Sequence, residues 1–223
     1  MDVQSFQTNA NNFFGRVIQM AEEAFNTAER TPLNMDLDRL IKESEKRRKW
    51  AESLVAQTEN MIQPNPALRV EDLILKGMDR KKMRTNAGEQ LGESMNAIGD
   101  LLGERTSGGS ALKICASSQI KIGQAEHKLQ EKVTSEYIDW LRDYVANEAK
   151  IAKQERDNLE TARLDLDRLK TLQKRAKNDK QKELSLQVDE SQMKFQRQCV
   201  ATKKMLEESI EKFDSQKDQL KKL

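Results

Sequence analysis

The chain contains neither glycine nor proline from Gln124 to Leu223, and this absence most restricts how it can fold. Such a stretch can reverse direction only through a polar loop. Apolar residues recur through it at steps of three and four, which predicts helix and argues against the alternation of a strand. A single helix of about 65 residues would be about 100 Å long at 1.5 Å per residue.

The same spacing divides the chain into three long helices. The first covers about 33–62 and continues over about 88–103, after an insert at about 63–87. The second covers about 110–176, after a predicted loop at 105–109 with Ser110 as N-cap, and the third about 183–223. The polar residues 177–181 form the predicted reversal between the second and third helices. We therefore expect an all-α fold, an elongated three-helix antiparallel coiled coil over residues 32–223, completed by a second copy.

Composition limits the functional classes. Charged residues make up 34% of the chain and aromatic residues 4%, which suits narrow seams between helices better than a thick core. The net charge is only +2, so a basic binding surface must come from local clusters. No secretory signal or membrane-spanning apolar run is visible, and Cys115 and Cys199 form no paired motif. These features predict a cytoplasmic protein in a reducing compartment.

The inventory of reactive side chains argues against an enzyme. His127 is the only histidine, and we expect it to be a solvated helix residue. There is no nucleophile–base pair, metal-ligand cluster or phosphate-binding glycine loop, so we predict no catalysis, metal or cofactor. Both cysteines occupy seam positions and are expected in the core. Glycines at 88, 92, 99 and 103 predict close helix approach.

Residues 1–31 form an amphipathic segment that ends before Pro32. Four of the six phenylalanines lie here, and acidic residues offset the basic ones, so insertion of apolar side chains would have to drive any membrane binding. The alternative is a helix packed on the bundle. The residues expected to insert are Phe6, Phe13, Phe14, Val17, Ile18 and Phe25.

The insert repeats this arrangement on a smaller scale. Its Pro-Asn-Pro opening cannot continue the preceding helix. The expected inserting residues are Leu68, Leu73, Ile74 and Met78, and the expected lipid-binding cations are Lys76, Arg80, Lys81, Lys82 and Arg84. The alternative is a surface loop packed on the bundle.

Further basic clusters predict contact with anionic phospholipid, where each lysine or arginine is worth about 1 kcal/mol. They comprise Lys170, Lys174, Arg175, Lys177 and Lys180 at the reversal, and more weakly Arg47 and Arg48 on the first helix. The alternative for the reversal is a merely solvated end. Nucleic acid is disfavoured as a partner because no aromatic residues alternate with these cations.

Three segments carry a resemblance to a known family. They are IQPNPALRVEDLILKGMDRKK at 62–82, IGQAEHKL at 122–129 and IAKQERDNLETARLDLD at 151–167. All three resemble the endophilins, particularly the B-type endophilins. The resemblance implies an N-terminal amphipathic helix followed by a BAR domain, which dimerises into a six-helix crescent and bends membranes by scaffolding and wedging.

The same resemblance implies partners and a setting. It suggests a homodimer, heterodimers with related endophilins, and peripheral binding to Golgi, mitochondrial or autophagic membranes. Endophilins have a longer last helix and an SH3 domain, so the resemblance predicts a fragment or short isoform with a weaker dimer and no SH3-mediated partners. The competing hypothesis is a coiled-coil adaptor whose N-terminal segment binds a groove on another protein.

Overall fold

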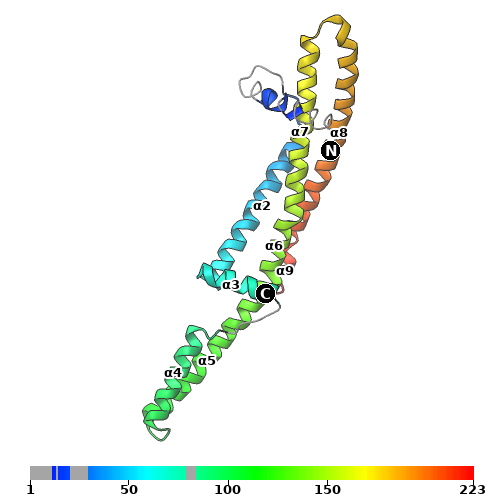
Figure 1. The fold of residues 1–223 in the computed structure, drawn as a ribbon. Coiled ribbons are helices and arrows are strands. Elements are labelled where there is room, and N and C mark those ends of the chain that lie inside the picture. The colour runs from blue at the N-terminus through cyan, green and yellow to red at the C-terminus, as the bar shows by residue number, and fades with distance from the viewer. Residues whose placement is uncertain (1–11, 14, 21–29, 79–83) are drawn as a thin grey trace. The chain divides into compact units, whose positions relative to one another are not determined.

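The computed structural model describes residues 12, 13, 15–20, 30–78 and 84–223 (Figure 1). Every regular element in these ranges is helical, which confirms the all-α prediction. The elements are α2 (Met35–Ile62), α3 (Pro66–Gly77), α4 (Ala87–Leu102), α5 (Ser107–Val133), a π-helix (Thr134–Ile138), α6 (Asp139–Ala146), α7 (Glu148–Arg175), α8 (Asn178–Asp214) and α9 (Gln216–Leu220). Residues 12, 13 and 15–20 are also helical, and we call them the N-terminal helix.

The chain divides into two compact units. The first comprises Met1–Ala51 and Asp143–Gln216, and the second Glu52–Arg142 and Lys217–Leu223. In the first unit α7 and α8 run antiparallel, with the N-terminal part of α2 beside them (Figure 1). Their core is formed by Leu37, Ala152, Leu159, Leu166, Phe195 and Leu206. The step of seven between the three α7 residues is that of a coiled-coil seam, as predicted.

In the second unit α4 and α5 form a hairpin whose close contact depends on glycine. A Cβ atom on Gly92 would lie 2.9 Å from the carbonyl oxygen of Ala116, and one on Gly99 would lie 3.1 Å from that of Gly109. The predicted close approach is therefore confirmed at these two positions. Gly103 has a different role, because its φ of 84° ends α4 in a conformation that favours glycine.

Two predicted helix boundaries are wrong. The helix after the α4–α5 turn begins at Ser107, not Ser110, because the Thr106 hydroxyl caps it by accepting the Gly109 N–H at 3.0 Å. The reversal after α7 occupies only residues 176–177, and α8 starts at Asn178 instead of near residue 183. Polar residues are as compatible with the first turn of a helix as with a loop, so polarity alone placed this boundary too late.

The predicted second helix follows one helical path but is not uniform. The π-helix interrupts it at residues 134–138, and Asn147, which separates α6 from α7, has non-helical backbone angles. A π-helical turn accommodates an extra residue in the path. It lies where Tyr137 and Ile138 are buried. The apolar spacing does not reveal such a change in hydrogen-bonding pattern.

Two expectations about single residues are also wrong. Cys115 is exposed, whereas Cys199 is half-buried against the core of the first unit. His127 is not a solvated residue, because its Nε2 lies 3.0 Å from the Glu89 carboxylate and both side chains are mostly buried. Glu89 also accepts the backbone N–H of Asn86, so the capping box of α4 and the histidine share one carboxylate. The Asn86 hydrogen bond is the main cause of a lowered Glu89 pKa.

Candidate membrane interface

The N-terminal helix contacts α7 through its polar side. Arg16 donates from Nε to Asp165 Oδ1 at 2.8 Å and from Nη2 to Oδ2 at 2.7 Å. Arg168 donates to Asn12 Oδ1 at 3.0 Å. Gln19 is buried on the same side, where the Thr171 hydroxyl lies 3.5 Å from its amide oxygen. The hydrogen bond to Asp165 raises the Arg16 pKa, so the guanidinium stays charged.

The apolar side of the same helix is open to solvent. Phe13 and Ile18 are each 60% exposed, and Val17 and Met20 are also exposed. A helix that merely completed the bundle would bury this side and expose its polar one. The exposed residues include three of the six expected to insert; Phe6, Phe14 and Phe25 lie outside the described residues.

The insert folds into α3, and its exposed apolar residues follow one line. Val70, Ile74 and Met78 are exposed at steps of four, whereas Leu68 is half-buried. Ile74 and Met78 were expected from the sequence; Val70 adds a third member of the line. The side chains of Leu73 and Lys76, and residues 80–82, lie outside the described part of the chain.

Three of the expected lipid-binding arginines are held in ion pairs within the chain. Arg84 lies 2.7 Å from both Glu71 and Asp72, so it links the end of the insert to α3. Arg48 contacts Glu45 at 2.6 Å. These pairs reduce the charge that the two arginines can offer a bilayer.

Arg47 is the third arginine of this kind. It lies 3.0 Å from Asp214 and 2.8 Å from Glu43, and its side chain is mostly buried. The hydrogen bond to Asp214 is the main cause of its raised pKa. Arg47 therefore joins α2 to α8.

Most of the basic cluster at the reversal is exposed to solvent. Lys174, Arg175, Lys177 and Lys180 are exposed around the short connection between α7 and α8. Lys170, about one turn earlier, is half-buried and donates to the Thr31 hydroxyl at 2.9 Å. We call the four exposed residues the basic tip. Their proximity follows from the two-residue reversal, which the sequence placed slightly too late.

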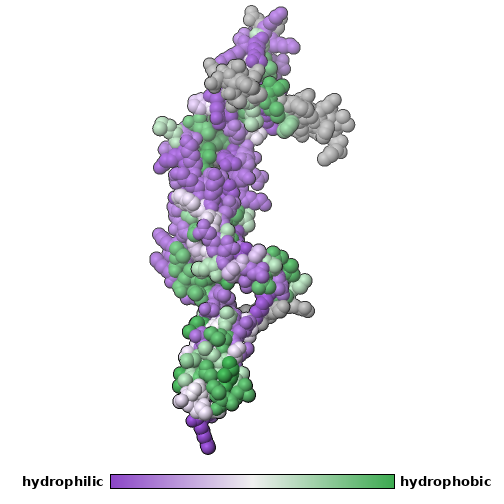
Figure 2. Space-filling model, turned by 90° about the vertical axis from the view of Figure 1, so that its left-hand side faces the viewer, coloured by the Kyte–Doolittle hydropathy of each residue, from purple (hydrophilic) through white to green (hydrophobic). Residues whose placement is uncertain are grey.

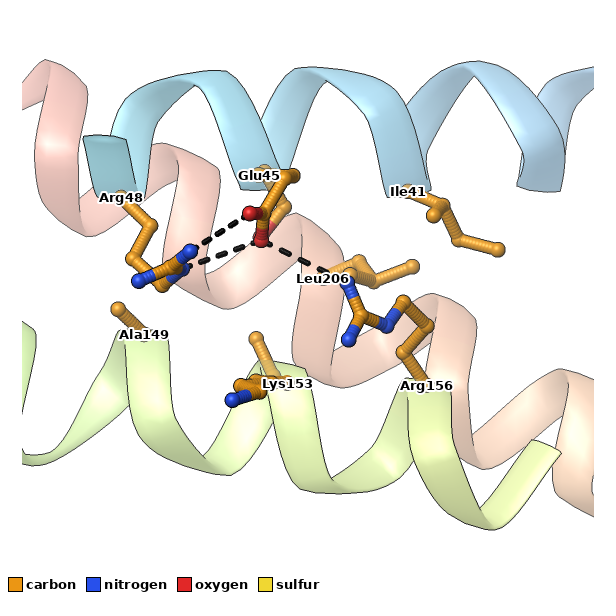
Figure 3. A pocket seen from close by; sticks show the side chains of 9 residues that line it. Ile41, Glu45, Arg48, Ala149, Lys153, Arg156 and Leu206 are labelled. Carbon is orange, nitrogen blue, oxygen red and sulfur yellow. Dashed lines mark hydrogen bonds and ion pairs between the residues drawn. The ribbon is translucent and has the colours of Figure 1, made fainter. Parts of the chain in front are cut away.

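A shallow notch lies between α2, α7 and α8 (Figure 3). Glu45 of α2 lies 2.6 Å from Arg48 on the same helix and 3.5 Å from Arg156, which reaches it from α7 across the notch. Arg156 also contacts Asp157 at 2.8 Å. The hydrogen bond from Arg48 is the first cause of a lowered Glu45 pKa. The chain's own carboxylates therefore satisfy both arginines, and sequence reasoning did not anticipate this network.

Other site types find no support in the described ranges. No helix there is long and apolar enough to cross a membrane. Within the same residues, no three or more histidine, cysteine, aspartate or glutamate side chains gather as metal ligands would.

Antiparallel long helices, two exposed apolar faces and a basic tip define a helical module suited to a bilayer surface. Comparison with known proteins agrees, since the BAR domain family matches residues 8–223. The chain therefore belongs to the BAR domain family. BAR domains generally bind membranes and dimerise, and the family consists of non-enzymatic membrane-remodelling scaffolds.

Among individual proteins, the similarity is to B-type endophilins, as the sequence motifs indicated. Endophilin-B1 of Homo sapiens is 34% identical over 212 residues, covering 92% of this chain and 57% of the relative. Endophilin-B1 of Rattus norvegicus is 35% identical over 208 residues, with the same coverage. Endophilin-B2 of Homo sapiens is 32% identical over 177 residues, covering 79% of this chain and 45% of the relative. The chain thus spans little more than half the length of the Endophilin-B1 proteins that it matches.

Proposed function

We propose that this chain is a dimeric peripheral membrane protein that binds anionic bilayers and generates or stabilises their curvature. The observation that carries the proposal is the N-terminal helix, whose polar side meets α7 while its apolar side faces solvent. Exposed apolar groups of this kind are stabilised by partial insertion among lipid acyl chains. The line of Val70, Ile74 and Met78 on α3 supplies a second, smaller inserting face.

The size of the apolar contribution explains why two copies are needed. Burying one Phe, Ile, Val or Met side chain fully is worth about 1.5–3 kcal/mol, and an interfacial position yields only part of this. Four such side chains on one helix therefore give weak, reversible binding. A second copy on the same rigid body converts two weak insertions into one stronger attachment.

The basic tip supplies the electrostatic part of binding. Each exposed lysine or arginine near an anionic leaflet contributes about 1 kcal/mol, within a Debye length of about 8 Å at physiological salt. In our proposal Lys174, Arg175, Lys177 and Lys180 attract the bilayer and the apolar faces then insert. Arg47, Arg48 and Arg84 are assigned to internal ion pairs and are not part of this surface.

A second copy is the proposed partner of the apolar face on the α4–α5 hairpin. Exposed apolar side chains gather over this hairpin in Figure 2. They include Leu91, Ile98, Leu101 and Leu102 of α4 and Ile114, Ile122 and Leu129 of α5. Leu101 alone is 88% exposed. Dimerisation is general in the family, and burying this face would remove an exposed patch that monomeric proteins rarely tolerate.

Vesicle sedimentation tests the membrane proposal. Wild-type protein should sediment with phosphatidylserine-containing vesicles and deform them into tubules. The double substitution Phe13→Glu with Ile18→Glu should abolish most of both activities without lowering the melting temperature. Val200→Glu is a matched control, because Val200 is a 72% exposed apolar residue of α8 that belongs to neither inserting face. Wild-type protein that stayed in the supernatant would favour the protein-adaptor hypothesis instead.

The dimer and the compartment need separate tests. Leu101→Glu should shift sedimentation-velocity profiles towards monomer, whereas Val200→Glu should not.

The similarity to Endophilin-B1 supports Golgi, mitochondrial or autophagic membranes as the place of action, which imaging of the tagged protein in cells would test. Uniform staining that the Phe13→Glu/Ile18→Glu variant did not change would contradict that assignment.

A further inference from the structure

The contacts of the N-terminal helix suggest a role for its polar side. Arg16 forms two parallel hydrogen bonds with Asp165, a geometry that fixes orientation as well as distance. Arg168 reaches Asn12 and also crosses Gly15, where an added Cβ would lie 2.6 Å from the arginine Nε. Glycine at this position thus leaves room for the arginine. Three contacts along about two helical turns set one side of the helix against α7.

A second attachment to α7 follows at the start of the bundle. The backbone N–H of Thr31 lies 3.1 and 3.2 Å from the two oxygens of Asp167, and its hydroxyl also donates to this carboxylate. Lys170 donates to the same hydroxyl. Asp167 is buried, so this attachment is firmly placed. Asn12, Arg16, Gln19 and Thr31 therefore all contact one stretch of α7, from Asp165 to Thr171.

The side of the N-terminal helix that contacts α7 determines whether this contact blocks or permits lipid binding. An autoinhibitory contact would cover Phe13, Val17 and Ile18, and they would have to leave the bundle before meeting lipid. Here α7 contacts Asn12, Arg16 and Gln19 instead. The bilayer and α7 would use opposite sides of the helix, so both contacts can exist at once.

We propose that Arg16, Asp165 and Arg168 are positioning residues that hold the inserting helix folded on α7 before and during membrane contact. This inference rests on the proposed membrane function and deepens it. The docked helix lies about 10 Å along α7 from the first residues of the basic tip, given 1.5 Å per residue between Arg168 and Arg175. Insertion and electrostatic attraction would then act on one patch of bilayer.

The expected effect follows from the population of the docked state. The apparent dissociation constant equals the intrinsic value divided by the fraction of molecules whose helix is ready to insert. If loss of the Arg16–Asp165 pair leaves about a tenth of molecules ready, vesicle affinity falls about tenfold. The substitution Asp165→Arg is the informative one, because it adds positive charge and would strengthen binding to anionic vesicles if the contact had no positioning role.

The experiment uses the full chain with both native cysteines replaced by serine and a nitroxide placed on Ile18→Cys. Electron paramagnetic resonance without lipid reports whether the helix is held, and sedimentation with phosphatidylserine vesicles reports binding, with unlabelled protein as reference. We expect Asp165→Arg to increase nitroxide mobility and weaken vesicle binding about tenfold. The exchanged pair Arg16→Asp with Asp165→Arg should restore both. Asp38→Arg is the control, because it makes the same charge change in an exposed ion pair on α2.

Unchanged nitroxide mobility in Asp165→Arg would overturn the positioning role. Binding stronger than that of Asp38→Arg would also overturn it and would show that the contact is inhibitory. If wild-type protein failed to bind vesicles, the proposed function would fall and the membrane role of the docked helix with it. The lipid-free mobility would still report separately whether the ion pair holds the helix.

Discussion

Removal of the Asp167 carboxylate should destabilise the first unit more than any exposed charge change. Arg163 is 1% exposed and Asp167 0% exposed, and their N–O distance is 2.9 Å. Removing one partner of a buried pair costs about 3–5 kcal/mol, because the other charge remains desolvated. Glu160 still accepts two hydrogen bonds from Arg163, at 3.0 and 2.6 Å. We therefore place Asp167→Ala at the lower end, about 3 kcal/mol, with loss of the Thr31 contact included.

Urea unfolding at a fixed chain concentration measures this cost, because dimerisation would make stability depend on concentration. The control is Asp38→Ala, which removes the exposed partner of Lys42 and should cost less than about 1 kcal/mol. Asp167→Asn keeps the shape and one acceptor and should fall between the two. Equal midpoints for Asp167→Ala and Asp38→Ala would refute the view that the buried Asp167 carboxylate stabilises the first unit.

The remaining predictions concern packing, pH and curvature. Gly92→Leu should destabilise the hairpin by about 1–3 kcal/mol in urea unfolding, since its side chain meets the backbone of α5. Gly108→Ala should not, because the added Cβ would meet only Leu102 Cδ1 at an ordinary contact distance of 3.9 Å. The hydrogen bond from Arg163 is the main cause of a lowered Glu160 pKa. Glu160 therefore stabilises the fold above its unfolded-state pKa, and this stabilisation is lost as the pH falls through the lower folded value. Acid titration of Glu160→Gln should show a shallower loss of stability. Val70→Ser with Ile74→Ser should reduce vesicle tubulation more than sedimentation, because the basic tip still binds.

The apolar spacing predicted much of the seam of the first unit, because burial selects the residues that face inward. Leu159 and Leu166 lie seven residues apart and are buried as expected, whereas one heptad earlier the buried residue is Ala152 and the bulkier Ile151, which the spacing favoured, is 48% exposed. Helix ends were predicted less well. They depend on which nearby hydroxyl happens to reach a free N–H, and Thr106 and Ser110 are equally plausible caps from sequence.

The ion-pair partners of basic residues were predicted least well from the sequence. A cluster such as Lys46–Lys49 looks like a basic surface along the chain. In the structure Arg47 meets Asp214, 167 residues away, and this partner cannot be found from neighbouring positions. The basic tip is different, because its cations surround a reversal whose ends are close in sequence. Neighbouring positions in the sequence therefore indicate which cations lie near one another at a reversal, but not which distant carboxylates they meet.

The N-terminal helix shows the same limit in its orientation. Its periodicity defines an apolar side and a polar side, but not which of them meets the bundle. Packing alone would place the apolar side inward, at the cost of leaving Arg16 to solvent. Asp165, 149 residues away, reverses that choice, because a bidentate pair and a buried glutamine make the polar side complementary to α7. Under the proposed membrane function, Asp165 would therefore matter to insertion without touching lipid, because it keeps the polar side of the helix on α7 and leaves Phe13 exposed.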